Sequence, residues 1–209
     1  MKITSIKQQL KMRGRYSVYI DEKYSFSLGE VVLMDSRLHS GMELTEQEID
    51  DYKKLSTDDK LYGRALNYVA MRQRTLWEVT FYLERKGADT PLAQSIVSKL
   101  SDLGLLDDAK FARSFINDRV LLRPSSRRKI IMELKKKRVS EAVINQAFAK
   151  LIEESDDNPE RTALLEVITR KRRQTKYQDD TKLMQYLARQ GFGYSDIKSA
   201  LSQDGFEDY

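Results

Sequence analysis

Near the start of the chain, apolar and polar residues alternate in two short stretches. Residues 16–20 and 24–28 each follow this two-residue period, and the polar pair 22–23 lies between them. That pattern is typical of a β-hairpin. A lone hairpin is marginal in water, so we expect it to gain a third strand within residues 3–10 or to pack on a neighbouring element.

The residues after the hairpin predict a helix start and then a break. Thr45 and Glu48 have the spacing of a capping box, which predicts a helix from there through Tyr52. The acidic and polar residues 56–59 that follow predict a boundary between this N-terminal head and the rest of the chain.

Beyond the head, helical patterns recur with a period of about 50 residues. Leu83, Leu134 and Leu187 occupy the same place in each repeat, and each has one apolar helix pattern before it and another after it. Gly104 suits a left-handed helix end, and Asp107 suits the cap of the next helix. Self-similarity of this length indicates stacked modules of three helices each.

These patterns predict a mainly α protein: tandem three-helix repeats in an elongated array, with a small head that contains a β-hairpin. The high charged content, 33%, favours such an exposed shape. The predicted modules are the head at residues 1–56 and three-helix repeats at 57–106, 107–155 and 156–209. The last boundary falls in the acidic segment 153–160, and we expect residues 204–209 to fray.

Composition limits the compartment. The chain of 209 residues has no cysteine, which excludes disulfides and thiolate metal sites and fits a reducing environment. The first residues lack the apolar core of a signal peptide, and no apolar run approaches the roughly 18 residues of a membrane helix. We therefore expect a soluble cytoplasmic protein that does not bind membranes.

The sequence contains no recognisable catalytic site. The single histidine, His39, has no nucleophile motif beside it, and we expect it in a surface loop. No glycine-rich phosphate loop is present. Paired aspartates occur at 58–59, 107–108, 156–157 and 179–180, and we interpret them as helix caps rather than metal ligands. The prediction is a protein without enzymatic activity and without a cofactor.

Positive charge is concentrated in the second repeat. Residues 113–138 contain ten basic side chains and two acidic ones, in a chain whose net charge is +5. A helical projection directs Ile130 and Leu134 toward the core and the neighbouring cations away from it. The other repeats carry basic clusters as well. The candidate partner-binding residues are Arg72, Arg74, Arg85, Lys86, Arg127, Arg128, Lys129, Lys135, Lys136, Arg170, Lys171, Arg172 and Arg173.

Such clusters have two interpretations. Most charge runs are solvated faces that keep a protein soluble. Here, however, the three repeats place cations at the same relative position near aromatic residues, and this favours a surface for a polyanion or for an acidic protein groove. No motif for reading bases in a DNA groove is present.

Four segments give the chain a resemblance to a known family. They are Arg-Tyr-Ser-Val-Tyr-Ile-Asp at 15–21, Gly-Leu-Leu-Asp-Asp-Ala-Lys-Phe-Ala at 104–112, Arg-Arg-Lys-Ile-Ile-Met-Glu-Leu-Lys-Lys-Lys at 127–137 and Tyr-Leu-Ala-Arg-Gln-Gly-Phe at 186–192. With these segments, the chain resembles RecX, the bacterial family that modulates the RecA recombinase. The second segment is the most specific of the four.

The resemblance implies a curved array of repeats, a monomer, that lies in the groove of a RecA filament on single-stranded DNA. It implies a nonenzymatic regulator that restrains filament ATPase and strand exchange in recombination and DNA repair. The alternative is a helical-repeat protein that binds nucleic acid directly, without a recombinase partner; weak direct DNA binding is compatible with both. One departure concerns the turn after Lys137, where the family has glycine and this chain has Arg138. Because arginine disfavours the left-handed conformation, we expect a different turn there.

Overall fold

The chain forms two compact units, and each is described by itself. The structure, a computed structural model, describes residues 1–154 and 158–204. The first unit contains Met1–Gln73 and Val79–Leu106, and the second contains Arg74–Glu78 and the described residues from Asp107 onward.

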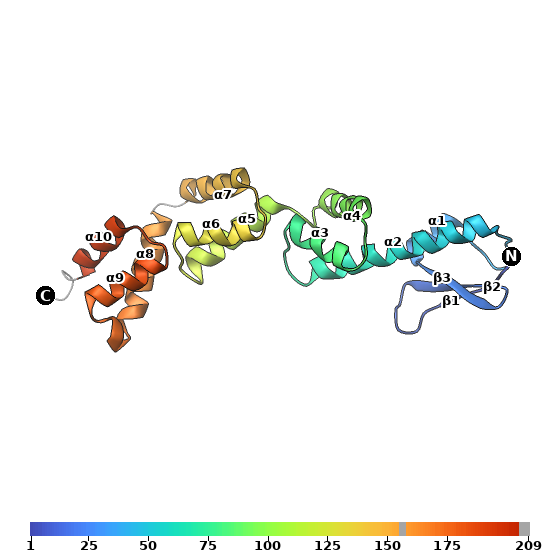
Figure 1. The fold of residues 1–209 in the computed structure, drawn as a ribbon, viewed down its shortest axis with the longest axis horizontal. Coiled ribbons are helices and arrows are strands. Elements are labelled where there is room, and N and C mark those ends of the chain that lie inside the picture. Colours follow the sequence, from blue (N-terminus) through green and yellow to red (C-terminus); the bar gives the residue numbers. More distant parts are fainter. Residues whose placement is uncertain (155–157, 205–209) are drawn as a thin grey trace. The chain divides into compact units, whose positions relative to one another are not determined.

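Three strands and ten α-helices lie within the described residues (Figure 1). This arrangement confirms the prediction of a mainly α protein with a small N-terminal β element. In chain order the elements are β1 (Ile3–Gln8), β2 (Arg15–Ile20), β3 (Lys23–Gly29), α1 (Glu30–Ser36), α2 (Glu46–Ala70), α3 (Leu76–Arg85), α4 (Thr90–Asp102), α5 (Asp108–Leu121), α6 (Arg127–Lys136), α7 (Glu141–Glu153), α8 (Pro159–Arg172), the 3-10 helix η1 (Thr175–Tyr177), α9 (Asp180–Arg189) and α10 (Tyr194–Asp204).

The strands form an antiparallel sheet in the order β1-β2-β3. Asp21 and Glu22 connect β2 to β3, and both have positive φ, 46° and 68°. A two-residue turn with both φ values positive matches the right-handed twist of a hairpin. The predicted hairpin is therefore confirmed, and β1 is its expected third strand.

The sheet packs on the first half of α2. Val18 and Leu28 of the sheet are fully buried with Ile49 of α2 in one apolar cluster. The rings of Phe26 and Tyr52 stack at a centroid distance of 5.5 Å. The head and the long helix therefore share a core.

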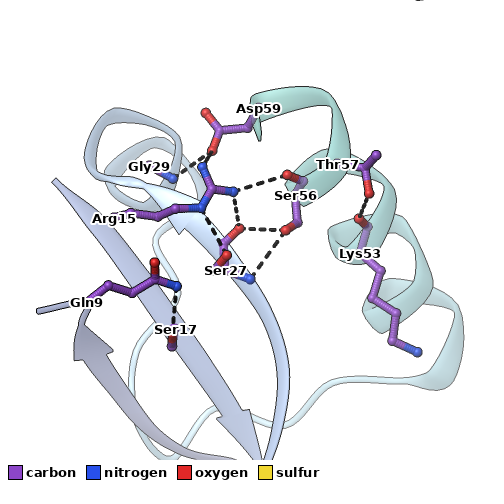
Figure 2. Close-up of polar contacts among 9 residues, drawn as sticks. All are labelled: Gln9, Arg15, Ser17, Ser27, Gly29, Lys53, Ser56, Thr57 and Asp59. Atoms are coloured by element: carbon purple, nitrogen blue, oxygen red, sulfur yellow. Dashed lines mark hydrogen bonds and ion pairs between the residues drawn. The ribbon is translucent and has the colours of Figure 1, made fainter. Parts of the chain in front are cut away.

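A buried polar network reinforces this contact (Figure 2). The Arg15 guanidinium of β2 donates to Asp59 Oδ2 at 2.7 Å, to Ser27 Oγ at 3.0 Å and to the Ser56 carbonyl at 3.1 Å. Asp59 Oδ2 also accepts the Gly29 amide at 2.8 Å, and the Ser56 hydroxyl donates to the Ser27 carbonyl at 2.6 Å. These bonds satisfy a cation that is only 8% exposed.

Helix α2 runs without interruption from Glu46 to Ala70. The capping box of Thr45 and Glu48 is confirmed, but the predicted helix end at Tyr52 is wrong, because the helix continues through residues 56–59. The polar character of that stretch has another cause, because Ser56 and Asp59 face the head and bond to Arg15.

The helical repeats place equivalent leucines in their cores. Leu83 is fully buried in the first unit, and Leu134 and Leu187 are fully buried in two separate clusters of the second unit. The first cluster joins side chains of α5, α6 and α7, and the second joins those of α8, α9 and α10. The three-helix pattern read from the sequence is thus present around Leu134 and Leu187.

Two turns test the predictions about helix ends. Gly104 has φ of +70°, and Asp107 caps α5 by accepting the Ala109 and Lys110 amides at 2.8 and 3.0 Å, as predicted. Arg138 has φ of +61°, so the expected departure from a left-handed turn is wrong. The backbone there keeps the conformation that glycine would adopt.

The division into modules at residues 56, 106 and 155 stays a prediction. Its first boundary falls inside α2, and its last lies at residues 155–157, outside the described part of the chain. The fraying predicted for residues 204–209 also stays a prediction, because residues 205–209 lie outside the described part of the chain.

Candidate functional site

Helix α6 contains five basic residues, and most of them are exposed to solvent. Ile130 and Leu134 are buried, Arg128, Lys135 and Lys136 are exposed, and Lys129 is half-buried. The helical projection of the sequence predicts these directions, because they follow from the helical period alone.

Ser126 fixes the start of α6 against the end of α9. Its hydroxyl caps α6 by accepting the Lys129 amide at 3.2 Å and donates to the Gln190 carbonyl at 2.6 Å. The Lys129 ammonium donates to Gln190 Oε1 at 2.9 Å. Gly191, with φ of +91°, allows this approach, because a Cβ there would lie 2.8 Å from Ser126 Oγ.

An open groove of about 490 Å³ lies between α6 and α9. Four of its lining side chains are cationic, and its one carboxylate, Glu133, is bonded to Arg119 at 2.9 Å. Clustered cations with little opposing charge raise the local potential and attract anions. The lining residues are Arg128, Lys129, Met132, Glu133, Lys136, Ala188, Arg189, Gln190 and Gly191.

The second unit repeats the Ser126 arrangement at Thr75. This buried threonine accepts the Glu78 amide at 3.2 Å and donates to the Lys137 carbonyl at 3.1 Å. The Lys137 ammonium pairs with Glu78 at 2.8 Å, in the place that Lys129 and Gln190 take at the other contact. In both cases the hydroxyl that caps the middle helix of one repeat donates to a backbone carbonyl of the next repeat. That carbonyl belongs to the residue that directly follows the middle helix of the next repeat.

A carboxylate completes the Thr75 contact. Asp108 Oδ1 accepts the Leu76 amide at 2.9 Å. Burial raises the pKa of Asp108 above its ordinary value, and the bond to the Leu76 amide partly offsets this shift. Asp108 therefore works as a structural acceptor, not as a metal ligand.

Several predicted binding residues have partners inside the protein. The Arg127 guanidinium lies 4.8 Å from the Phe148 ring centroid, and Lys135 pairs with Glu141 at 2.9 Å. Lys171 lies over the rings of Tyr177 and Tyr186, and Arg172 donates to the Gln178 carbonyl and to Asp180. Arg170 and Arg173 are exposed on the end of α8.

The predicted residues around α3 do not line the groove. Arg72 donates to the Gln73 carbonyl at 2.8 Å, and Arg74 is half-buried. Arg85 lies 5.8 Å from the Phe81 ring centroid and Lys86 lies 5.6 Å from that of Tyr82. Of the thirteen candidates, the structure brings Arg128, Lys129 and Lys136 together around one space.

Sequence reasoning missed Arg189, the fourth cation of the groove. The repeat contains the signal that would have found it. Arg85, Lys136 and Arg189 each follow the equivalent leucine by two residues. Arg189 therefore occupies, in the third repeat, the position of the candidate partner-binding residues Arg85 and Lys136.

The described part of the chain contains no group of three or more histidine, cysteine, aspartate or glutamate side chains arranged to hold a metal ion.

His39 lies exposed in a loop, as predicted. Asp107 and Asp179 are helix caps, also as predicted, whereas Asp59 is bonded to Arg15 within a helix. Residues 156–157 lie outside the described part. None of the described helices has the length and apolarity to cross a bilayer.

Comparisons with known proteins converge on one family. Residues 1–45 match the model of the regulatory protein RecX N-terminal domain, and residues 107–147 match that of the RecX second three-helix domain. A regulatory protein RecX of Lactobacillus johnsonii is 34% identical over 152 residues, which cover 73% of this chain and 56% of the relative. The chain thus spans little more than half the length of that protein.

Two further comparisons cover more. A regulatory protein RecX of Lactobacillus delbrueckii subsp. bulgaricus is 30% identical over 202 residues, 97% of this chain and 74% of the relative. The crystal structure of a regulatory protein RecX superposes with a TM-score of 0.71 at 27% identity, and the match covers 96% of this chain and 98% of the other.

Proposed function

Because this chain belongs to the RecX family of regulatory proteins, we propose that it regulates the RecA recombinase. It acts as a monomer that binds the RecA filament on single-stranded DNA and restrains filament ATPase and strand exchange in recombination and DNA repair. It does so by binding, without chemistry of its own.

The groove between α6 and α9 is the observation that carries this proposal. Arg128, Lys136 and Arg189 line it, are exposed, and form no hydrogen bond or ion pair with any residue that the structure describes. The Ser126 and Gly191 contacts hold the two helices in place around it. A fixed basic groove without a catalytic group suits the recognition of an anionic surface, which a RecA filament on DNA offers through protein carboxylates and phosphates.

The groove cations differ in how well they serve as a test. Lys129 and Lys135 have partners within the protein, so reversing their charge would also disturb the fold. The variant of choice combines Arg128→Glu, Lys136→Glu and Arg189→Glu. Lys136 and Arg189 end their helices, where a glutamate costs about 0.3–1 kcal/mol through the helix dipole. The melting temperature should therefore fall slightly while the fold persists.

The measurement is inhibition of RecA strand exchange and of RecA ATPase on single-stranded DNA. We expect the triple variant to need at least about tenfold more protein for the same inhibition, because like charges then face the anionic partner. The matched control combines Lys11→Glu, Arg13→Glu and Lys23→Glu in the head, an equal change in net charge at exposed positions. It should inhibit like the unaltered protein. Full inhibition by the groove variant would contradict the proposal.

A further inference from the structure

Among the helices that the structure describes, four end in the same backbone turn. In each, the amide of the residue five positions after a leucine donates to the carbonyl of that leucine. The residue directly before the donor has positive φ. Three of the turns use glycine at that position, Gly87, Gly104 and Gly191, and the fourth uses Arg138. Glycine adopts positive φ without steric cost, whereas an arginine does not.

The fold draws no benefit from the arginine side chain. Val139 N bonds to the Leu134 carbonyl at 3.2 Å, as Ala88 N bonds to that of Leu83 at 3.1 Å in a turn with glycine. Arg138 is exposed, and its guanidinium forms no hydrogen bond or ion pair with any residue in the described ranges. No hydrogen bond or ion pair of the side chain within the described residues therefore accounts for an arginine at this position.

The neighbouring lysines are already used. Lys135 pairs with Glu141 at 2.9 Å and Lys137 pairs with Glu78 at 2.8 Å. Lys136 lines the groove between α6 and α9. Of these four consecutive cations, Lys136 and Arg138 are thus the two that a partner can take.

We propose that Arg138 is a partner-binding residue whose guanidinium receives a carboxylate of a RecA protomer in the filament. The planar guanidinium binds a carboxylate through two parallel hydrogen bonds. A phosphodiester chain fits less well, because its repeated charges would also meet the carboxylates of Glu141 and Glu78, which pair with the neighbouring Lys135 and Lys137. This inference rests on the proposed function and adds a contact to it.

The test is Arg138→Gly, which removes the cation and the strain together. The melting temperature should rise by about 2 °C, since glycine relieves the positive φ. The affinity for RecA filaments on single-stranded DNA should fall about tenfold, as for the loss of a charge-assisted hydrogen bond. Affinity for naked single-stranded DNA should stay within about twofold. A residue with only a structural role would not show stability and affinity moving in opposite directions.

Two further variants complete the design. Arg37 also has positive φ, +52°, at the end of α1 and is exposed, so Arg37→Gly is a matched control. It should raise the melting temperature and leave filament affinity unchanged. Arg138→Lys keeps the charge but loses the planar fork, and it should weaken filament binding only about threefold.

The outcomes separate this inference from the proposed function. Equal filament binding by Arg138→Gly and the unaltered protein would overturn the role of Arg138 and leave the proposed function standing. An equal loss on naked DNA and on filaments would overturn the carboxylate assignment. Equal losses by Arg37→Gly and Arg138→Gly would mean that net charge is responsible, and would overturn the inference. Absence of filament binding by the unaltered protein would overturn the proposed function and this inference with it.

Discussion

Arg15 shows how one buried cation can be stabilised. Its guanidinium is surrounded by one carboxylate, one hydroxyl and two backbone carbonyls, those of Ser27 and Ser56. Removing a guanidinium from water is costly, and such a residue is stable only where its donors are satisfied. Because Asp59 supplies the only carboxylate among those bonds, the pair matters far more than an ion pair on the surface.

Asp59→Ala should therefore be strongly destabilising. It leaves Arg15 charged and buried without its counterion, which costs about 3 kcal/mol or more in unfolding free energy. Urea unfolding followed by circular dichroism measures the loss. Asp50→Ala is the matched control in the same helix, because Asp50 pairs with Lys53 at 2.9 Å in an exposed position. That loss should stay below about 1 kcal/mol. Equal losses would show that the Arg15 network is solvated.

The partner of Arg15 could not be read from the sequence. Alternation along residues 16–20 predicts the strand because the period is local. Nothing in that period identifies Asp59, which is 44 positions away and becomes a neighbour only when the sheet packs on α2. The polar residues 56–59 consequently looked like a linker, although two of them face a buried cation.

At the scale of elements, the predictions that held depend on local geometry. The capping box at Thr45 and the left-handed turn at Gly104 each involve residues a few positions apart. The helix end predicted at Tyr52 failed because composition does not distinguish a polar linker from a helix face that packs on polar groups. The prediction for the turn at Arg138 failed for a different reason. The surrounding helices impose a left-handed conformation that arginine alone disfavours.

Gly104→Val tests the turn between α4 and α5. A Cβ at Gly104 meets no atom within 4 Å, so the expected cost comes from φ of +70° alone and is about 1–2 kcal/mol. Gly63, inside α2, has equally open surroundings and no positive φ, so Gly63→Ala should stabilise the protein by about 0.5–1 kcal/mol. Thermal unfolding of both variants gives the comparison. Effects of the same sign would contradict the left-handed assignment.

At the scale of the whole molecule, the sequence indicated basic clusters but not the space between two helices. Arg128 and Lys136 were found because they lie on one face of α6. Arg189 was missed because it is not part of a basic cluster in the sequence, and only the contact of Ser126 with Gln190 brings it to the same groove. Cations of the candidate set such as Lys171 and Arg172 have internal partners, which no one-dimensional pattern reveals.

The salt dependence of binding distinguishes a filament regulator from a protein that binds nucleic acid directly. Three groove cations that neutralise phosphates of a single strand give a slope of log affinity against log salt of about −2. Raising salt from about 50 to 200 mM should then weaken binding to naked single-stranded DNA about twentyfold. Contacts with protein carboxylates release no condensed counterions, so binding to RecA-coated DNA should weaken less steeply. Fluorescence anisotropy with labelled oligonucleotides, with and without RecA, measures both slopes.

The triple variant of Arg128, Lys136 and Arg189 is the control for that measurement. If these cations contact phosphates, it should bind naked DNA with a nearly flat salt dependence, because few counterions remain to be released. On RecA-coated DNA it should lose affinity at every salt concentration, since the repulsion from the filament surface is short-ranged. One result would favour direct nucleic-acid binding over filament recognition. The unaltered protein would show equal salt slopes on naked and RecA-coated DNA, and the variant would flatten both slopes equally.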